Sequence, residues 1–399
     1  MRLVSQMRRI GVCLIVVGSL ASMPVALATP SISVDVKSGR VIAHEDAFQR
    51  WYPASLTKIM TAYLAFSAVK SGQMSMDTPI TMSVHASKEP PSKMYFKPGE
   101  RFPLDSALKY LMVKSANDVA VAIAEAVSGS EEAFVREMNA TARAIGMQAT
   151  RFVNPNGLPG SGQYTTAHDM AVLAVAARRN FPEYAQYFGY EGFAIGKQTH
   201  TNYNLLIGRF QGADGMKTGY ICASGFNQVS SATRNGKTVV SVVLGAPSQT
   251  ARAEKSAELL NAALTSSVSG SATTLASLAP YGEGRDVVAD ISAQICSAKA
   301  RAARDKNRDE NGKLVLGSPY LVELAREPRL VRAPAMPKQA GTEIALSRIP
   351  VPLPRPTGVL SGSAVPVTAS AFVAPAQAAE MSPLRPGVTI PVPVPRPEL

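Results

Sequence analysis

The stretch PASLTKIM at residues 53–60 decides how this chain is to be interpreted. Ser55 and Lys58 stand three positions apart, where an extended segment gives way to an apolar pattern with helical spacing. Three residues are nearly one helical turn, so the two side chains are expected on the same face, near the helix N-terminus. The pattern therefore predicts a hydroxyl and an amine as neighbours.

Two alternating segments flank the helical region and predict β-hairpins. SISVDVKSGRVIA at 31–43 alternates apolar and polar residues around a Ser38-Gly39 turn. GFNQVSSATRNGKTVVSVVLGA at 225–246 has two strand-like runs about Asn235-Gly236, a favoured tight-turn dipeptide. Between them the periodicity is mostly helical, which predicts an α/β sandwich, an antiparallel sheet with helices packed on it and a helical subdomain.

Composition divides the 399 residues into four parts. We expect a secretory signal at 1–28, because basic residues precede a short apolar run that ends in ALA. A catalytic domain is expected at 29–265, followed by a linker with a possible helix at 266–330. Residues 331–399 are rich in Pro and Ala and contain IPVPLPRP and IPVPVPRP, which predicts a disordered tail without an amphipathic C-terminal membrane anchor.

The formal charge of +12 is spread along the chain without long basic runs, so an anionic envelope polymer or a membrane surface is a better expected partner than nucleic acid. Cys222 and Cys296 can form one disulfide in an oxidising compartment, although the sequence gives no geometry for it. The four histidines lack Glu or Cys at ligand spacing, so no metal site is expected. They are His44, His85, His168 and His200.

Two further short motifs follow Ser-x-x-Lys in order. SAN at 115–117 comes after an apolar helical segment, and KTG at 217–219 precedes the second hairpin. Such an ordered set is the signature of penicillin-binding proteins and class A β-lactamases. The chain resembles the low-molecular-mass penicillin-binding proteins of the D-alanyl-D-alanine carboxypeptidase type from about residue 30 to 262. The similarity extends through PASLTKIMTAYL, FKPGERF, MVKSANDVAVAIAE, GQYTTAHDMA and DGMKTGY.

This resemblance implies an acyl-serine mechanism without a cofactor. Ser55 is the expected nucleophile, and Lys58 can act as its base only if burial and a second cation, such as Lys217, keep the amine neutral. By resemblance, Ser115 relays a proton to the leaving group and Asn117 hydrogen-bonds the substrate amide.

The KTG strand is expected to hold the substrate. By resemblance, Thr218, Lys217 and Arg252 bind its terminal carboxylate, and the backbone N–H groups of Ser55 and Tyr220 form the oxyanion hole. Gly219 lets a substrate strand approach closely because it has no side chain. Tyr220 stands where several such enzymes have histidine, and Arg252 is aligned across a loop.

The expected function is a periplasmic carboxypeptidase in peptidoglycan biosynthesis, and hence in cell shape. It removes the terminal D-alanine from stem pentapeptides and is inhibited by β-lactams. A D,D-endopeptidase of the same fold stays open, although SAN in place of SEN disfavours it. A class A β-lactamase is disfavoured, because this sequence has no clear Glu-x-x-x-Asn element between SAN and KTG that could activate a deacylating water. A non-catalytic wall-binding protein is the remaining alternative.

Overall fold

The structure is a computed structural model that describes residues 29–266, 273–305, 308–309 and 312–337. The expected signal segment at 1–28 and the tail beyond 337 lie outside the described residues. Contacts within the chain separate residues 1–339 from residues 340–399, and the second part is not described. No described helix combines the length and the apolar character that crossing a bilayer requires.

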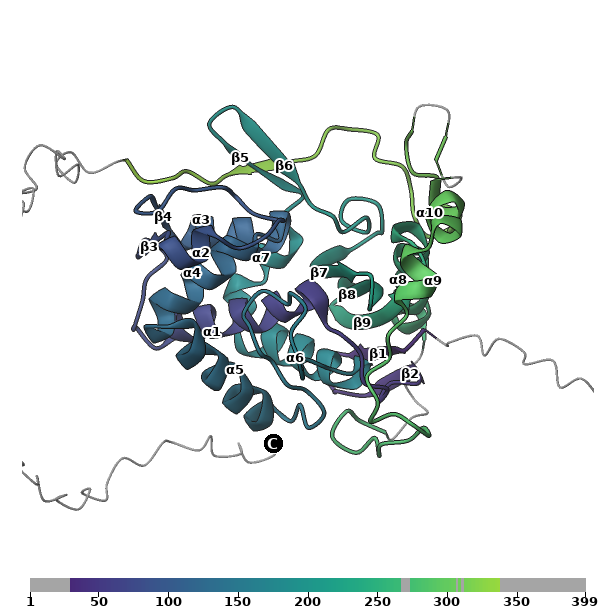
Figure 1. The fold of residues 1–399 in the computed structure, drawn as a ribbon. Coiled ribbons are helices and arrows are strands. Elements are labelled where there is room, and N and C mark those ends of the chain that lie inside the picture. The colour runs from purple at the N-terminus through teal and green to yellow at the C-terminus, as the bar shows by residue number, and fades with distance from the viewer. Residues whose placement is uncertain (1–28, 267–272, 306–307, 310–311, 338–399) are drawn as a thin grey trace, which may run out of the picture. The chain divides into compact units, whose positions relative to one another are not determined.

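A five-stranded antiparallel sheet forms the centre of the fold (Figure 1). Its strand order is β2, β1, β9, β8, β7, so the first hairpin of the chain lies beside the last one. Both predicted hairpins are confirmed. The strands are β1 (Ser31–Asp35), β2 (Val41–Glu45), β7 (Ala213–Ile221), β8 (Gly225–Arg234) and β9 (Lys237–Ala246).

Turn chemistry explains the register of the second hairpin. Asn235 and Gly236 both have positive φ, at 49° and 75°, as a two-residue turn that matches the strand twist requires. The turn pairs Arg234 with Lys237, and the pairing continues inward along β8 and β9. On its other side β8 pairs with β7, which is one of the two edge strands of the sheet.

Helices cover both faces of the sheet. Alternate residues of β9 point to opposite sides: Val240 and Val242 join the main core with α6, whereas Val239 packs with α8. The predicted α/β sandwich is therefore confirmed. The helices that build these layers are α1 (Lys58–Lys70), α4 (Asn117–Ser128), α5 (Glu131–Ile145), α6 (Ala167–Asn180) and α8 (Gln249–Thr265).

Short elements complete the helical subdomain and its rim (Figure 1). β3 and β4 form a two-stranded sheet, and β5, β6 and β10 form a three-stranded one. The elements are η1 (Ala54–Thr57), β3 (Pro79–Thr81), α2 (Val84–Ser87), β4 (Arg101–Pro103), α3 (Leu104–Lys109), η2 (Tyr110–Lys114), η3 (Pro182–Tyr184), α7 (Gln186–Gly189), β5 (Gly192–Ile195), β6 (Gln198–Thr201), α9 (Ser292–Cys296), α10 (Ala298–Asp305) and β10 (Leu330–Arg332).

The chain does not leave the core at residue 265, where we expected the globular part to end. Leu275, Ile291, Ile295 and Ala333 are all buried in the main core. The expected linker at 266–330 therefore packs on the sandwich over its described part. Leu275 and Ala333 are isolated in sequence, and Ile291 and Ile295 form only one pair at helical spacing, so the segment gives little periodic pattern.

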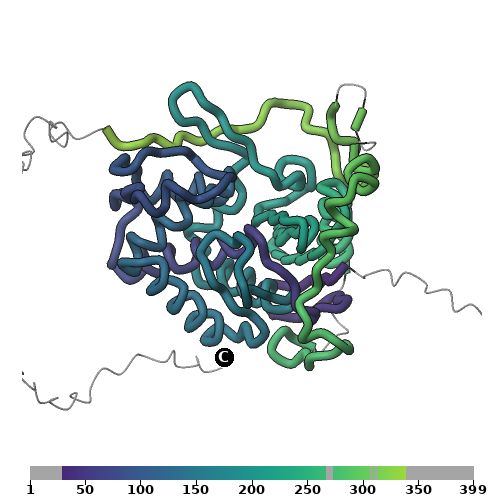
Figure 2. Tube along the Cα trace, in the orientation of Figure 1, coloured from purple at the N-terminus to yellow at the C-terminus, as the bar shows by residue number. Residues whose placement is uncertain are grey.

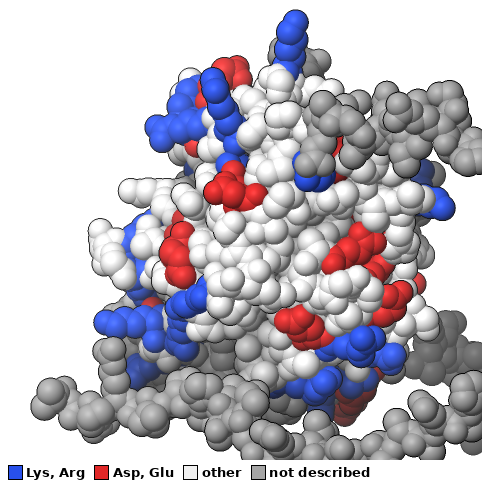
Figure 3. All heavy atoms as spheres, turned by 90° about the vertical axis from the view of Figure 1, so that its left-hand side faces the viewer, with Lys and Arg blue, Asp and Glu red and all other residues white. Residues whose placement is uncertain are grey.

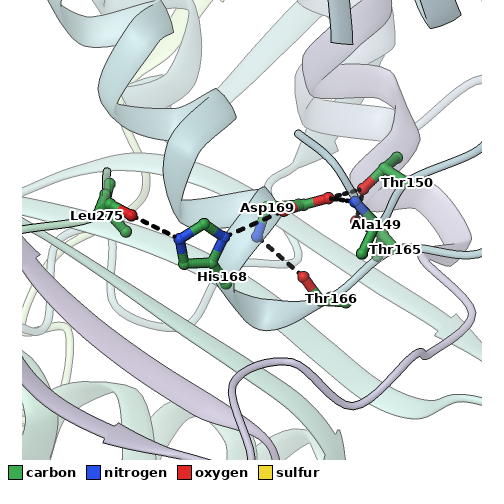
Figure 4. A network of polar contacts seen from close by, with 7 residues as sticks. All are labelled: Ala149, Thr150, Thr165, Thr166, His168, Asp169 and Leu275. Atoms are coloured by element: carbon green, nitrogen blue, oxygen red, sulfur yellow. Dashed lines mark hydrogen bonds and ion pairs between the residues drawn. The ribbon is translucent and has the colours of Figure 1, made fainter. Parts of the chain in front are cut away.

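A polar network holds the first described part of this segment to α6. The Nε2 atom of His168 lies 2.9 Å from the carbonyl oxygen of Leu275, and its Nδ1 atom lies 3.1 Å from Asp169 Oδ1 (Figure 4). Asp169 Oδ2 in turn accepts hydrogen bonds from the Thr150 hydroxyl and the Ala149 amide. Residues near 275 are thus attached to the start of α6.

The possible helix that we expected within 266–330 is two short helices in the described residues. α9 ends at Cys296 and α10 begins at Ala298. Cys296 is bonded to Cys222, with 5.7 Å between the two Cα atoms, so these two cysteines form a disulfide. This bond attaches α9 to the turn between β7 and β8.

Residues 326–336, here called the strap, continue across the helical subdomain beside β5 and β6 (Figure 2). β10 pairs in parallel with β5, the Tyr110 hydroxyl donates to the Ala333 carbonyl, and Arg326 forms two hydrogen bonds with Glu191. Residues 331–337, which we expected in a disordered tail, are therefore ordered by main-chain pairing. The rest of the expected tail lies outside the described residues.

On the face shown in Figure 3, lysine and arginine side chains are interspersed with aspartate and glutamate. The described part of that face therefore has no continuous basic area of the kind that a nucleic-acid backbone would require.

Candidate active site

The predicted serine and lysine lie side by side. Pro53 precedes η1, Ser55 lies within it, and Lys58 is the first residue of α1. The Nζ atom of Lys58 is 3.2 Å from the Oγ atom of Ser55. The short 3₁₀ turn therefore brings the two side chains together at the start of a buried helix.

Lys58 is fully buried, and its amine faces three oxygen atoms. It donates to Asn117 Oδ1 at 2.7 Å and to the Asn156 carbonyl at 2.5 Å, besides the Ser55 contact. Burial lowers the pKa of Lys58 well below its usual value, and the charge on Lys217 lowers it further. A neutral amine keeps two N–H donors for the two asparagines and presents its lone pair to the serine hydroxyl.

Ser115 follows a local change in helix geometry. η2 is a π-helical turn that ends at Lys114, and Ser115 follows it with φ at 62°. The Tyr110 carbonyl accepts hydrogen bonds from the amides of Ser115 and Ala116. Within the described residues the Ser115 hydroxyl is buried and has no hydrogen-bond partner. A hydroxyl in this state is available to a bound molecule.

Lys217 lies on β7, buried behind the same site. Burial lowers its pKa to about 7, with a further contribution from the charge on Arg252. Its amine donates to the Thr218 carbonyl at 3.0 Å. Two lysines with depressed pKa values therefore lie in one site. For each of them, burial and a neighbouring cation disfavour the protonated amine.

Gly219 lies where β7 passes η1. A Cβ atom there would be 3.0 Å from the Pro53 carbonyl oxygen and 3.1 Å from the Ser55 nitrogen. Only glycine fits without movement of these backbone atoms. Close packing places the Ser55 amide beside the strand, which is a further reason for glycine beyond the substrate approach that we predicted.

Arg252 reaches the site from α8, on the other side of β7 and β8. Its guanidinium is buried and donates to the Tyr203 carbonyl at 3.2 Å, with longer contacts to the carbonyls of Gly219 and Asn227. Burial lowers its pKa to about 9. Arg252, which was aligned across a loop in the sequence, therefore lines the same cavity as Ser55 and Thr218.

Most of these groups line a cavity of about 400 Å³. Its described lining has no acidic side chain, and Lys58 and Lys217 lie behind its wall rather than on it. The arrangement suits a ligand with a carboxylate and an electrophilic carbon. Of the residues predicted from the sequence, the lining includes Ser55, Ser115, Asn117, Thr218, Gly219, Tyr220 and Arg252.

Tyr220 forms one side of the cavity mouth. Its ring packs on Phe226 with 4.4 Å between centroids, and its hydroxyl lies 3.3 Å from Cys296 Sγ. The disulfide is therefore next to the residue whose amide is expected in the oxyanion hole. A larger cavity of about 920 Å³ lies between α6 and residues 274–286, away from the motif residues.

Sequence reasoning missed three residues that hold the site in shape. The Asn156 carbonyl binds Lys58, and Asn227 donates to the Tyr52 carbonyl while it accepts from the Gly245 amide. Gly157 has φ at 84°, and a Cβ there would lie within 1.8 Å of the Ala54 carbonyl oxygen. The turn signal in NPNG at 154–157 predicts a loop, but not its contacts with Ala54 and Lys58.

Among the described residues, no group of three or more His, Cys, Asp or Glu side chains is placed to hold a metal ion.

Comparisons with curated proteins identify relatives of one kind. The chain is 35% identical over 236 residues to D-alanyl-D-alanine carboxypeptidase DacC of Escherichia coli, covering 57% of this chain and 59% of that protein. It is 34% identical to DacF of Bacillus subtilis, covering 55% and 57%. The match thus spans less than two thirds of the length of these relatives.

Solved structures show the same fold. The D-alanyl-D-alanine carboxypeptidase DacD of Francisella tularensis aligns with a TM-score of 0.57 at 35% identity, covering 59% of this chain and 70% of that one. Penicillin binding protein 6B of Escherichia coli aligns with a TM-score of 0.57 at 29% identity, covering 62% and 80%.

The family comparison covers the sheet, the helical subdomain and all three motifs. Residues 19–248 match the D-alanyl-D-alanine carboxypeptidase family, which is more than half of the 399 residues. This chain belongs to the D-alanyl-D-alanine carboxypeptidase family.

Proposed function

We propose that this chain is a serine-type carboxypeptidase that removes the terminal D-alanine from peptidoglycan stem pentapeptides through an ester on Ser55. One observation carries the proposal. A buried lysine with a depressed pKa contacts a serine hydroxyl at the edge of a cavity that also contains Arg252 and Thr218. Family membership supports the same reaction.

Acylation begins with proton transfer. Neutral Lys58 takes the proton of Ser55 as the Oγ atom attacks the carbonyl carbon of the penultimate residue. Negative charge develops on the carbonyl oxygen, and the backbone N–H groups of Ser55 and Tyr220 stabilise it. The lack of space at Gly219 supports this arrangement, because it holds the strand close to the Ser55 amide.

Collapse of the tetrahedral intermediate breaks the peptide bond and releases D-alanine. Ser115 passes the proton that Lys58 took from Ser55 on to the leaving amine, so Lys58 is neutral again; the buried Ser115 hydroxyl is free for this relay, since it has no other partner among the described residues. The C-terminal carboxylate is bound by the Thr218 hydroxyl with the charges of Lys217 and Arg252. Water then attacks the ester, and Lys58, neutral again, takes the proton of that water and returns it to the Ser55 Oγ atom as the ester bond breaks, so the serine hydroxyl is restored.

β-Lactams are proposed inhibitors that acylate Ser55 in the same way. Penicillin-Binding Protein D2 of Listeria monocytogenes has been solved in an ampicillin-bound form, and it aligns with this chain with a TM-score of 0.52 at 26% identity. The proposed location is the periplasm, after export by residues 1–28. An oxidising compartment also suits the disulfide between Cys222 and Cys296.

The full chain tests the proposal when it is incubated with labelled pentapeptide, crosslinked muropeptides and benzylpenicillin, with products followed by mass spectrometry. D-Alanine release from the pentapeptide by the wild type but not by Ser55→Ala supports it. Cleavage of crosslinks alone identifies an endopeptidase, and rapid penicillin turnover identifies a β-lactamase. No reaction with any of the three contradicts an enzymatic role and favours wall binding.

A further inference from the structure

We propose that Glu89, acting through Asn156, is a positioning residue that controls how readily Lys58 accepts the Ser55 proton. The inference rests on the proposed function, because it assigns a task to a residue outside the three motifs. Glu89 lies in the loop after α2, within the sequence KEPPS at 88–92.

Glu89 is linked to the base by one intervening residue. Its Oε2 atom accepts a hydrogen bond from the side-chain Nδ2 of Asn156 at 2.7 Å. The backbone carbonyl of the same asparagine accepts a hydrogen bond from Lys58 Nζ. Asn156 Oδ1 also accepts from the Leu158 amide at 2.9 Å. Both ends of the Asn156 side chain are therefore occupied, and Glu89 holds the end that faces away from the 156–158 turn.

The same loop also holds the second oxygen partner of Lys58. Asn117 donates through Nδ2 to the Pro90 carbonyl at 2.9 Å, and its backbone N–H donates to the Ser92 carbonyl at 2.7 Å. Lys93 donates to the Glu89 carbonyl at 2.9 Å. Residues 89–92 thus support both asparagines that bind Lys58, so a change at Glu89 reaches the amine through these two hydrogen-bond partners.

The charge of Glu89 acts on the same amine. Glu89 and Asp118 raise the pKa of Lys58, in opposition to burial and Lys217. Asp118 accepts from the amides of Met94, Tyr95 and Val119, whereas Glu89 is hydrogen-bonded to a direct partner of Lys58. Of these two acids, Glu89 therefore combines the charge with a link to the geometry of the base.

Other charged groups act on Glu89 itself. Burial raises the pKa of this half-buried carboxyl, as does the charge on Glu131 of α5, while the Asn156 hydrogen bond, His85 of α2 and Lys58 of α1 lower it. His85 is hydrogen-bonded to Glu131. When Glu89 is ionised, its charge stabilises the ammonium form of Lys58 and thus limits the share of the reactive amine.

Glu89→Gln separates charge from geometry, because glutamine keeps an acceptor for Asn156 and loses the charge. The probe is fluorescent penicillin, whose acylation rate with the full chain is measured from about pH 5 to about pH 9. We expect the acid limb of the profile to move down by about one pH unit, since a neighbouring charge shifts a pKa on this scale. The limiting rate at high pH should stay within about twofold of wild type.

Glu89→Ala removes both the charge and the acceptor, so its limiting rate should also fall. Glu132→Gln is the matched control: it removes one charge from an exposed position of α5, and its profile should equal that of wild type. The proposal is overturned if the acid limb of Glu89→Gln coincides with that of wild type, or if Gln and Ala lower the limiting rate equally. A wild-type chain that penicillin does not label contradicts the proposed function instead.

Discussion

Lys58 and Lys217 lie buried within one site, and each has a depressed pKa. A buried ammonium loses its hydration, so folding is costly at any pH where these lysines must carry a proton. The two lysines are buried near Ser55, where a neutral amine can act as a base despite the unfavourable free energy of burial. Function and stability are therefore linked through the same protons.

The first prediction concerns this linkage. The pKa of Lys217 is about 7 in the folded chain, and about 10.4 is usual for an unfolded lysine. Between these values the unfolded chain binds a proton that the folded chain lacks, so the free energy of unfolding rises with pH. Urea titrations from about pH 7 to about pH 9.5 should show this rise in wild type and a smaller one in Lys217→Met. Equal slopes in both proteins contradict it.

The second prediction concerns Gly219. An alanine Cβ would press on the Pro53 carbonyl and the Ser55 amide, so Gly219→Ala should displace the expected oxyanion donor. We expect acylation by penicillin to slow by about 100-fold or more, with unchanged circular dichroism. Gly317→Ala is the control, since its Cβ meets only a side chain, at 3.5 Å. A Gly219→Ala rate near that of wild type would rule out tight packing there.

At the scale of single elements, α9 depends on β7 and β8 for its position. Ile291 and Ile295 pack over Gly225, the Ile291 amide donates to the Ala223 carbonyl, and Cys296 is bonded to Cys222. A five-residue helix is too short to be stable alone. The disulfide therefore fixes α9 beside Tyr220, which lines the cavity.

The third prediction removes that bond. In the Cys222→Ser/Cys296→Ser variant we expect stability to fall by about 2–4 kcal/mol, as is typical for loss of a native disulfide. Hydrogen exchange should increase at 289–305, and KM for the pentapeptide should rise more than kcat falls, because Tyr220 loses its support. The main core should keep its protection. Unchanged exchange at 289–305 is the result that would contradict this view.

The sequence predicts some elements well and others poorly, for physical reasons. Asn235-Gly236 specifies its turn by backbone conformation alone, and the apolar spacing after Pro53 specifies α1, so both are visible locally. The path of residues 273–337 is set by isolated contacts such as Leu275 with His168 and Tyr110 with Ala333. Contacts between residues far apart in sequence leave no local pattern. The site follows the same rule, since its motif residues are predictable but Asn156 and Glu89 are not.

At the scale of the whole molecule, the described core extends beyond the family match. Residues 19–248 match the family, yet buried positions continue to Ala333. Leu275, Ile291 and Ile295 would leave apolar surface on the sandwich if they were removed. The described core is therefore larger than the sequence comparison suggests.

The fourth prediction compares two truncations. A chain that ends at residue 337 should keep the melting temperature of the full chain within a few degrees, whereas one that ends at residue 265 should melt clearly lower. The shorter chain loses the disulfide and several buried apolar side chains, each worth about 1.5–3 kcal/mol. Differential scanning calorimetry provides the measurement. Equal melting temperatures would mean that the strap and α9 contribute nothing to stability.

β7 is one of the two edge strands of the five-stranded sheet, so one side of its backbone has no strand partner within that sheet, and its residues 218–221 line the cavity. Open edges of this kind readily recruit extended polypeptides, including other copies of the same protein. An unpaired β7 edge beside Ser55 therefore lets an extended ligand reach the nucleophile, but it also lowers the resistance of the protein to aggregation. A molecule seated along β7 should make concentrated solutions of the protein less prone to precipitate.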